Sequence, residues 1–453
     1  MPSPSEQPQA PVARPAPAPA GPLGWEELEA RAPAEPDRVH GPTNAQASLR
    51  LFGQDEGTLR LTLYRDHHAW CPYCQKVWLW LEERQIPHRI RKVTMFCYGE
   101  KEGWYRRLVP SGLLPALQLD GEVITESDRL LEALERAFGP LGAGMGDPEV
   151  VRLRQLERML FRAWCEWLCR PHSARSEARA RMEFQRMAQA MEGALEAQGG
   201  PLFLGSQLTT ADLVFVPYVE RMNASLAYYK GFGLRREHPG IHRWLTALEE
   251  RPTYLGTQSD FHTHAHDLPP QMGGCHASGD PAQRALAARI DAGPWPIGTP
   301  SGAAEAHQDD ACLDPETSQR EPADAAQVAL ARVLKHRAPI LARNPLPPEL
   351  FDPALRCALT TLLAGTTEAG AGDNDMALMP PPGSAPGLRY LRDRISVPRD
   401  MPLHSARRLR QALEATALRD PADPRAQSQP IPLGHRRDQD PRPFLSPPNS
   451  CAL

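Results

Sequence analysis

Two cysteines separated by two residues, Cys71 and Cys74, are the side chains of this chain best suited to do chemistry. They follow an alternating run over residues 59–64, which predicts a strand, and precede an apolar run over 77–81, which predicts a helix. The first turn of a helix has unpaired N–H groups and the positive end of the helix dipole. A cysteine there can have its pKa lowered from about 8.5 to between roughly 3.5 and 7.5. Pro72 fits that first turn, because its missing N–H needs no partner there.

The same spacing has two other interpretations. A C-x-x-C pair is half of many zinc sites, but Cys97, Cys165 and Cys169 do not repeat the spacing. The two thiols could also be idle and buried. The strand–turn–helix context favours a redox-active or nucleophilic pair.

Length and composition limit the protein class. The 453 residues predict two or three domains, and a net charge of −4 favours neither nucleic acid nor an anionic membrane. No apolar run approaches the roughly 18 residues of a membrane helix. Nine scattered cysteines indicate a reducing compartment, so we expect a cytoplasmic protein. The forty-nine prolines lie mainly before residue 48 and after residue 266, and we expect residues 1–55 to be a disordered leader.

The first folded unit is predicted over residues 56–140. Its elements follow the order β-α-β and then β-β-α, and the cysteine pair lies after the first strand. Asp120-Gly121 lies between two apolar runs and predicts a hairpin. The further elements expected here are a strand over 88–94, a strand over 116–119 and a helix from about 125 to 138.

The second unit, over residues 147–256, is predicted to be all helical. Apolar residues recur at helical spacing over 148–170, and Thr209 to Asp212 form a capping box that begins another helix. A further helix is expected over 239–250.

The remainder of the chain is predicted to be a linker over 257–281, an extension over 282–420 and a disordered tail over 421–453. Three histidines at alternate positions could bind a divalent metal together with a nearby cysteine, although a polar connector is the simpler interpretation; these residues are His262, His264, His266 and Cys275. The extension is expected to hold helices over 323–342, 355–363 and 404–417. The last of these carries Arg407, Arg408 and Arg410, which we expect on a solvated face.

Four motifs together resemble a glutathione S-transferase of the cysteine type: C-P-Y-C, Leu114-Pro115 before a strand, Glu126-Ser127 before a helix, and T-x-A-D ending at Asp212. The second cysteine and the long extension are most similar to the iota class of photosynthetic organisms. The resemblance implies an α/β thioredoxin-like N-terminal domain and an all-α C-terminal domain, followed by a partly disordered, mostly helical extension. Its Pro115 would be cis.

The resemblance also implies a glutathione site. Cys71 would be the thiolate that faces glutathione, with Tyr73 packed nearby. The backbone of Leu114-Pro115 would pair with the cysteinyl residue of glutathione, and Glu126-Ser127 would hold its γ-glutamyl end. Lys101 would meet the glycyl carboxylate, with a solvated surface lysine as the alternative.

The function implied is a glutathione-dependent thiol transferase or reductase. Cys71 would attack a glutathionylated sulfur, and a second glutathione or Cys74 would resolve the mixed disulfide. The second substrate would be a small-molecule or protein disulfide or electrophile. We expect no metal cofactor, no nucleic-acid or membrane partner, and a homodimer by family habit. The alternatives are a non-catalytic glutathione- or partner-binding redox sensor, and a metal- or iron–sulfur-binding protein.

Overall fold

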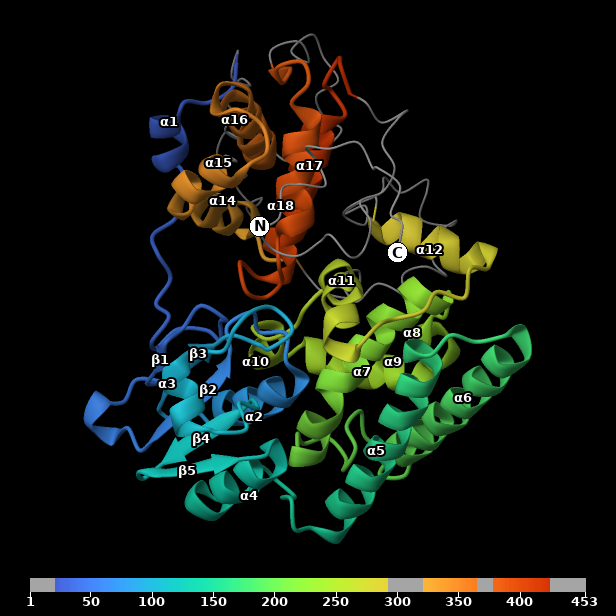
Figure 1. The fold of residues 1–453 in the computed structure, drawn as a ribbon. Coiled ribbons are helices and arrows are strands. Elements are labelled where there is room, and N and C mark those ends of the chain that lie inside the picture. Colours follow the sequence, from blue (N-terminus) through green and yellow to red (C-terminus); the bar gives the residue numbers. More distant parts are fainter. Residues whose placement is uncertain (1–20, 292–320, 365–377, 424–453) are drawn as a thin grey trace, which may run out of the picture.

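The computed structural model describes residues 21–291, 321–364 and 378–423. Figure 1 shows a lower lobe, which contains the sheet and helices α2 to α11, and an upper lobe, which contains α1 and α14 to α18. The predicted tail lies outside the described residues, apart from its first three positions.

The lower lobe contains one five-stranded mixed sheet with the order β1-β3-β2-β4-β5. β2 and β3 are parallel, and the other neighbours are antiparallel. Asp120 and Gly121 both have positive φ angles and join β4 to β5, so the predicted hairpin is present. The strands are β1 (Leu49–Arg50), β2 (Leu61–Asp66), β3 (His88–Val93), β4 (Ala116–Leu119) and β5 (Glu122–Thr125).

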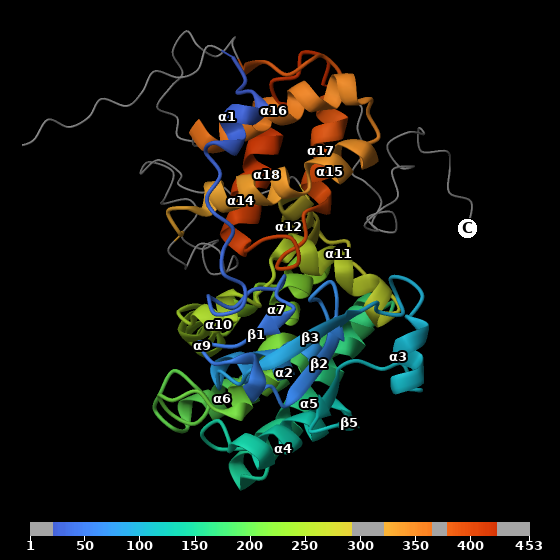
Figure 2. The ribbon, with the colours of Figure 1, turned by 90° about the vertical axis from the view of Figure 1, so that its left-hand side faces the viewer.

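Helices cover both faces of this sheet (Figure 2). Leu61 and Leu63 of β2 belong to a core shared with α2 and α4, whereas the alternate residue Tyr64 packs with Tyr105 of α3 in a separate cluster. The thioredoxin-like order predicted from the sequence is therefore confirmed. The helices of this domain are α2 (Pro72–Glu83), α3 (Gly103–Leu108) and α4 (Ser127–Phe138), with a 3₁₀ turn over Glu56–Thr58.

The second domain is helical, as predicted. Its central helix α7 begins with the expected capping box, in which the Asp212 carboxylate accepts the Thr209 backbone N–H at 3.0 Å. The same carboxylate accepts a hydrogen bond from Trp244 Nε1 at 2.9 Å, so Asp212 also links the start of α7 to α9. The helices are α5 (Pro148–Cys169), α6 (Ala174–Glu196), α7 (Thr210–Lys230), α8 (Leu234–Glu237), α9 (Pro239–Glu249) and α10 (Pro252–Leu255).

The predicted linker over 257–281 differs from the structure. Residues Phe261–Met272 form helix α11, which begins at the Asp260 cap and packs against α7, and α12 (Pro281–Asp291) follows. Two prolines inside α11, Pro269 and Pro270, made the segment look like a connector. Its buried apolar residues, Phe261 and Leu268 among them, supply the packing that overrides this signal.

The N-terminal segment also differs from the predicted disordered leader, in the part from residue 21 onward. Helix α1 (Trp25–Glu29) packs on the upper lobe, where the Leu23 N–H donates to Thr360 Oγ1 at 3.0 Å. Further along, β1 joins the sheet, and its Arg50 makes a buried ion pair with Glu82 of α2 at 2.9 Å. Residues 21–50 therefore run from one lobe to the other (Figure 1).

The extension has a core of its own. Its helices are α14 (Ala325–Lys335), α15 (Arg337–Arg343), α16 (Pro348–Ala364), α17 (Ala385–Arg394) and α18 (Leu403–Ala417). The single helix expected over 323–342 is divided at His336, and α17 was not expected. Apolar residues of α14, α16, α17 and α18 pack together with Leu23 and Leu28.

The extension docks on the lower lobe through buried polar contacts. The Arg410 guanidinium pairs with Asp260 at the start of α11 and donates to the Ile395 carbonyl at 2.6 Å. The Val397 N–H donates to Thr263 Oγ1 at 3.2 Å, and Ser259 Oγ donates to the Val397 carbonyl at 2.5 Å. The predicted solvated face of α18 is therefore wrong for Arg407 and Arg410, each of which is 3% exposed, and Arg410 forms this junction.

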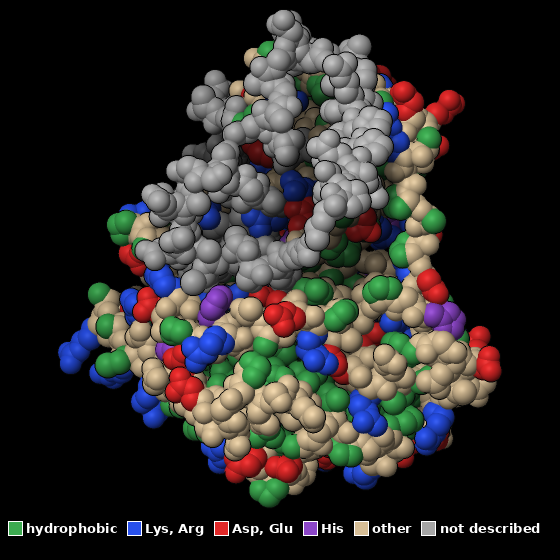
Figure 3. All heavy atoms as spheres, turned by 180° about the vertical axis from the view of Figure 1, so that it is seen from behind, with side chains coloured by type: hydrophobic (Ala, Val, Ile, Leu, Met, Phe, Trp, Pro, Cys, Tyr) green, Lys and Arg blue, Asp and Glu red, His purple; other side chains and the backbone are tan. Residues whose placement is uncertain are grey.

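The outer surface is mixed in charge. Figure 3 shows Lys, Arg, Asp and Glu side chains interspersed over the lower lobe seen from behind. Among the described residues, no helix combines the length and the apolar character needed to cross a bilayer.

Candidate active site

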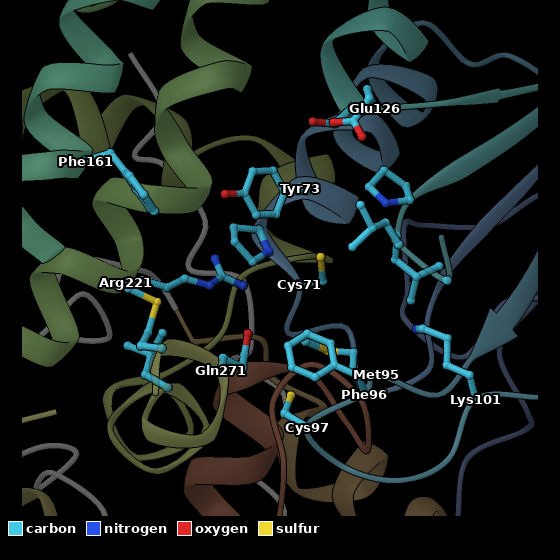
Figure 4. A pocket seen from close by; sticks show the side chains of 18 of the residues that line it. Cys71, Tyr73, Met95, Phe96, Cys97, Lys101, Glu126, Phe161, Arg221 and Gln271 are labelled. Atoms are coloured by element: carbon cyan, nitrogen blue, oxygen red, sulfur yellow. The ribbon is translucent and has the colours of Figure 1, made fainter. Parts of the chain in front are cut away.

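A cavity of about 680 Å³ opens between the thioredoxin-like domain and the helical domain. It is lined by every residue predicted to face or bind glutathione: Cys71, Tyr73, Lys101, Leu114, Pro115, Glu126 and Ser127. Figure 4 shows Cys71 between a wall that carries Glu126 and Lys101 and an opposite wall that carries Phe161 and Arg221.

Cys71 is the N-cap residue of α2. Its backbone is extended, with φ −73° and ψ 117°, and Pro72 occupies the first helical turn as predicted. The Cys71 carbonyl accepts the Gln75 N–H at 3.0 Å, which leaves the side chain at the open end of the helix. The residue is 6% exposed, so its sulfur reaches solvent only through the cavity.

Cys74 lies one turn further along α2 and does not line the cavity. It is 1% exposed. Burial, together with a hydrogen bond to Cys71, raises the pKa of the Cys74 thiol well above its usual value. The prediction that the second cysteine is the more buried of the two is therefore confirmed.

Three possible metal donors meet beside this helix. One ligand atom each from Asp66, Cys71 and Cys74 lies within 4.8 Å of the others, and no other such cluster occurs among the described residues. A structural zinc site usually has four protein ligands, and this cluster offers three. Three protein donors would instead suit a metal ion that keeps one coordination position for water or a substrate.

The metal site that His262, His264, His266 and Cys275 could have formed, the less favoured interpretation of this segment, does not assemble among the described residues. His264 Nε2 lies 2.6 Å from Glu220, and His266 Nε2 lies 2.9 Å from Asp291, so the imidazoles are held by carboxylates. Because the segment is a helix and not a strand, its histidines do not share one face with Cys275.

Two backbone features shape the wall beside Cys71. The Leu114–Pro115 peptide bond is cis, as the resemblance implied. Glu126, the N-cap of α4, has a φ of 68°, a conformation that residues with a side chain rarely adopt. Backbone strain of this kind tends to occur at functional sites, where the surrounding structure maintains it.

None of the residues in the opposite wall was among the predicted site residues. It comes from α5, α7 and α11 and consists of Arg158, Phe161, Trp164, Arg221, Leu268, Gln271 and Met272. Arg158 stacks its guanidinium on Phe161 at 5.2 Å. Arg221 is buried and donates to the Trp70 carbonyl at 2.6 Å and to Gln75 Oε1 at 2.8 Å, so it ties α7 to the segment around Cys71.

The charged lining of the cavity is mainly positive. Lys101, Arg158 and Arg221 line it together with a single carboxylate, Glu126, and Arg158 is itself paired with the adjacent Glu157 at 2.5 Å. Lys101 Nζ donates to the Thr94 carbonyl at 2.7 Å, and burial lowers the pKa of its ammonium group. A ligand with more than one carboxylate would be electrostatically favoured here.

A third cysteine, Cys97, also lines the cavity. Burial raises the pKa of its thiol to about 11, so Cys97 remains protonated at neutral pH. Burial likewise raises the pKa of Tyr73, whose hydroxyl can therefore donate a hydrogen bond at neutral pH. Of the two cysteines that line the cavity, Cys71 is the one placed at the start of a helix.

An ion pair links the starts of α2 and α4. Asp128, next to Ser127, pairs with the buried Lys76 and with Arg154 at 2.7 Å. Burial raises the pKa of Asp128, but the two cations outweigh burial and bring it to about 2. The pair therefore helps to hold Cys71 and Ser127 at fixed positions across the cavity.

We predict a pH-dependent stabilisation from Asp128. Its folded pKa of about 2 lies below the unfolded value of about 3.9, so its contribution is present above pH 4 and is lost as the pH falls toward 2. Asp128→Asn should cost about 1–2 kcal/mol at pH 7, since the carboxylate is partly exposed. Urea unfolding at several pH values measures this difference, and a difference that stays constant down to pH 2 would contradict the assignment.

Family comparisons agree with this geometry. Residues 70–137 match the glutathione S-transferase N-terminal domain, and residues 174–247 match the glutathione S-transferase C-terminal domain. The first match contains Cys71 near its start, and the second contains α7 with Arg221.

Individual relatives are distant. The chain is 24% identical to glutathione S-transferase DHAR2 of Arabidopsis thaliana over 42% of this chain and 84% of the relative. It is 26% identical to glutathione S-transferase L3 of the same plant over 42% of this chain and 79% of the relative. Among solved structures, the Chlamydomonas reinhardtii dehydroascorbate reductase is 20% identical with a TM-score of 0.36, covering 47% of this chain and 94% of that one.

Proposed function

We propose that this protein is a glutathione-dependent thiol transferase or reductase with Cys71 as its nucleophile. The observation that carries the proposal is the placement of Cys71 at the start of α2, facing a cavity between two glutathione S-transferase domains. Its membership of the iota class, a cytoplasmic location and a homodimer remain predictions.

The cavity has groups that suit each part of glutathione. This tripeptide has two carboxylates and one amine, which fits three cationic side chains and the single carboxylate of Glu126. The Leu114 backbone, beside the cis bond, would pair with the cysteinyl residue. The backbone N–H groups at the start of α4, with the Ser127 hydroxyl, would bind the γ-glutamyl carboxylate. Lys101 would bind the glycyl carboxylate.

The proposed reaction is a pair of thiol–disulfide exchanges. The Cys71 thiolate attacks the glutathione sulfur of a mixed disulfide, forms a Cys71–glutathione disulfide and expels the substrate as its thiolate. A glutathione thiolate then attacks the glutathione sulfur held on Cys71, releases glutathione disulfide and regenerates the Cys71 thiolate. Overall, one mixed disulfide and one glutathione are converted into one substrate thiol and one glutathione disulfide.

Cys74 offers a second way to resolve the intermediate. Its sulfur lies within 4.8 Å of Cys71, so it could attack Cys71 and release glutathione. Its raised pKa makes this slow at neutral pH, because the thiolate is the attacking form. External glutathione is therefore the main resolving thiol in the proposed cycle.

We predict that the Cys71–glutathione intermediate can be trapped. The full-length Cys74→Ser variant, mixed with one equivalent of a glutathionylated peptide and no free glutathione, should gain one glutathione on Cys71 and release one equivalent of peptide thiol. Intact-protein mass spectrometry and peptide mapping measure both products. The matched control, Cys71→Ser with Cys74→Ser, should gain none at that site.

Two outcomes would favour the alternatives. An adduct that forms on Cys71 but is not turned over by added glutathione would indicate a redox sensor. Stoichiometric metal in the purified wild type, lost in Cys71→Ser, would indicate a metal site formed with Asp66 and Cys74.

Dehydroascorbate should be tested beside the peptide, because it distinguishes a general reductase from an enzyme restricted to disulfides.

A further inference from the structure

Three cysteines outside the candidate active site meet at the C-terminal end of α5. Cys165 and Cys169 lie four residues apart and therefore on the same face of that helix. Cys275 lies three residues beyond the end of α11. All three residues are half-buried against the main core.

Backbone hydrogen bonds fix Cys275 beside α5. The His276 N–H donates to the Leu168 carbonyl at 2.9 Å, which places residues 275–276 against residues 168–169. The Ser278 N–H donates to the Tyr229 carbonyl at 2.8 Å and anchors the same segment to the end of α7. The proximity of the cysteines is therefore built into the fold of the second domain.

The sulfur of Cys169 is at the centre of this cluster. Hydrogen bonds from the thiols of Cys165 and Cys275, with the nearby charges of His276 and Lys230, lower the pKa of Cys169 below its ordinary value. The same hydrogen bonds raise the pKa values of Cys165 and Cys275. Cys169 is thus the most acidic of the three thiols and has a neighbouring thiol on either side, which is the arrangement of a nucleophile with a resolving partner.

We propose that Cys169 and Cys275 are a second redox site, which reacts with low-molecular-weight disulfides such as glutathione disulfide and closes to a reversible intramolecular disulfide. Cys169 attacks one sulfur of glutathione disulfide, forms a mixed disulfide and releases one glutathione. Cys275, deprotonated in the step, then attacks the Cys169 sulfur and releases the second glutathione. Two protein thiols are oxidised to one disulfide, and one glutathione disulfide is reduced to two glutathione molecules.

Cys165 is not the bridging partner in this proposal. Residues four apart on a helix have Cβ atoms roughly 5–6 Å apart. A disulfide needs about 3.8 Å between its Cβ atoms, so a bridge within α5 would distort the helix. Cys275 follows the αL end of α11 at Gly273, where the chain is not constrained by a helical repeat. Cys165 instead supplies a hydrogen bond to the attacking sulfur.

The bridge would act on the wall of the active-site cavity. Leu268, Gln271 and Met272 of α11 line the cavity, and Met272 is three residues from Cys275. A disulfide to Cys169 ties the end of α11 covalently to α5, which contributes Phe161 to the same wall. The second redox site would therefore fix this wall under oxidising conditions, and it requires no turnover at Cys71.

The test uses full-length protein that carries Cys71→Ser and Cys74→Ser. Whether the Cys169–Cys275 disulfide forms in this variant does not depend on the proposed transferase activity. The protein is incubated with glutathione disulfide, blocked with N-ethylmaleimide and mapped by mass spectrometry after proteolysis. We expect a peptide linking Cys169 to Cys275, at least tenfold more abundant than any other linked pair, and its loss on adding excess glutathione.

Further variants sharpen the test. Adding Cys165→Ser, a matched change one turn away on the same helix, should leave the 169–275 link in place, whereas Cys275→Ser should leave Cys169 with a glutathione adduct. A 165–169 link, a stable glutathione adduct on Cys169 in the presence of Cys275, or unmodified Cys169 would each overturn the proposal. The main measurement is made on a protein that retains both Cys169 and Cys275. The result for the linked peptide therefore stands even if the Cys165→Ser or Cys275→Ser variant misfolds.

Discussion

Replacing Cys71 by serine should reduce glutathione-dependent reduction of a glutathionylated peptide by at least about 1,000-fold, to the uncatalysed rate. A serine hydroxyl keeps the shape of the side chain but does not ionise near neutral pH and cannot form a disulfide. The nucleophile of the proposed cycle would then be absent. The measurement is the rate of peptide-thiol release at saturating glutathione.

Cys74→Ser is the matched control for this prediction. It is the same substitution one helical turn away, at a residue that does not line the cavity. Turnover should stay within about tenfold of the wild type, because external glutathione resolves the intermediate. If Cys71→Ser retained wild-type turnover, or if Cys74→Ser alone abolished it while the fold was intact, the assignment of the nucleophile would be wrong.

The largest expected effect on stability is that of Arg410→Ala. Its partner Asp260 is 2% exposed at the junction of the two lobes, and removing one member of a buried ion pair typically costs about 3–5 kcal/mol. The ion pair holds the extension against α11. Without it, the upper lobe should also become more sensitive to proteolysis. Urea unfolding and limited proteolysis of the full-length chain measure the two effects.

Controls for Arg410→Ala come from the same chain. Arg60→Ala breaks an exposed ion pair with Asp120 and should cause little change. The double change Arg410→Met with Asp260→Asn should be less destabilising than Arg410→Ala, because it leaves no unpaired charge. If Arg410→Ala were as mild as Arg60→Ala, the junction would not depend on this pair.

The pair also has a predicted dependence on pH. Burial raises the pKa of Asp260, but Arg410 outweighs burial and leaves it below the ordinary value. A lowered folded pKa means that the stabilisation is present above the unfolded pKa of about 3.9 and is lost as the pH falls below it. The stability difference between wild type and Arg410→Ala should therefore shrink in acid.

Local signals in the sequence were sufficient to predict the elements of the cavity wall that carries Lys101 and Glu126. Pro72 after Cys71 marks a helix start, Asp120-Gly121 specifies a hairpin, and Thr209 with Asp212 specifies a cap. Each depends on a few neighbouring residues and on backbone geometry that those residues determine. The cis bond before Pro115 came from resemblance, since local propensity does not predict it.

The second wall depends on contacts between distant segments, which the sequence does not display. Helical spacing shows that Phe161 and Trp164 belong to a helix, but not which helix faces the cysteine. One signal could have been used for Arg221. An arginine in the middle of an apolar helix needs a polar partner, and it finds the Trp70 carbonyl.

Composition misled the prediction at both ends of the folded region. The proline-rich leader and linker looked unable to form a core. From residue 21 onward, the leader instead packs on α16 and on β3, and α11 tolerates two prolines because α7 covers its apolar residues. Burial supplied by distant partners outweighed local composition in both segments.

The path of residues 21–50 has a consequence for biosynthesis. Helix α1 leaves the ribosome early, yet the Leu23 N–H bonds to Thr360, which is 337 residues away in sequence. At roughly 5–20 residues per second, that partner is synthesised about 20–70 s later. The nascent chain must therefore keep α1 unpaired for that time, because residues 21–50 can link the two lobes only after Thr360 has left the ribosome.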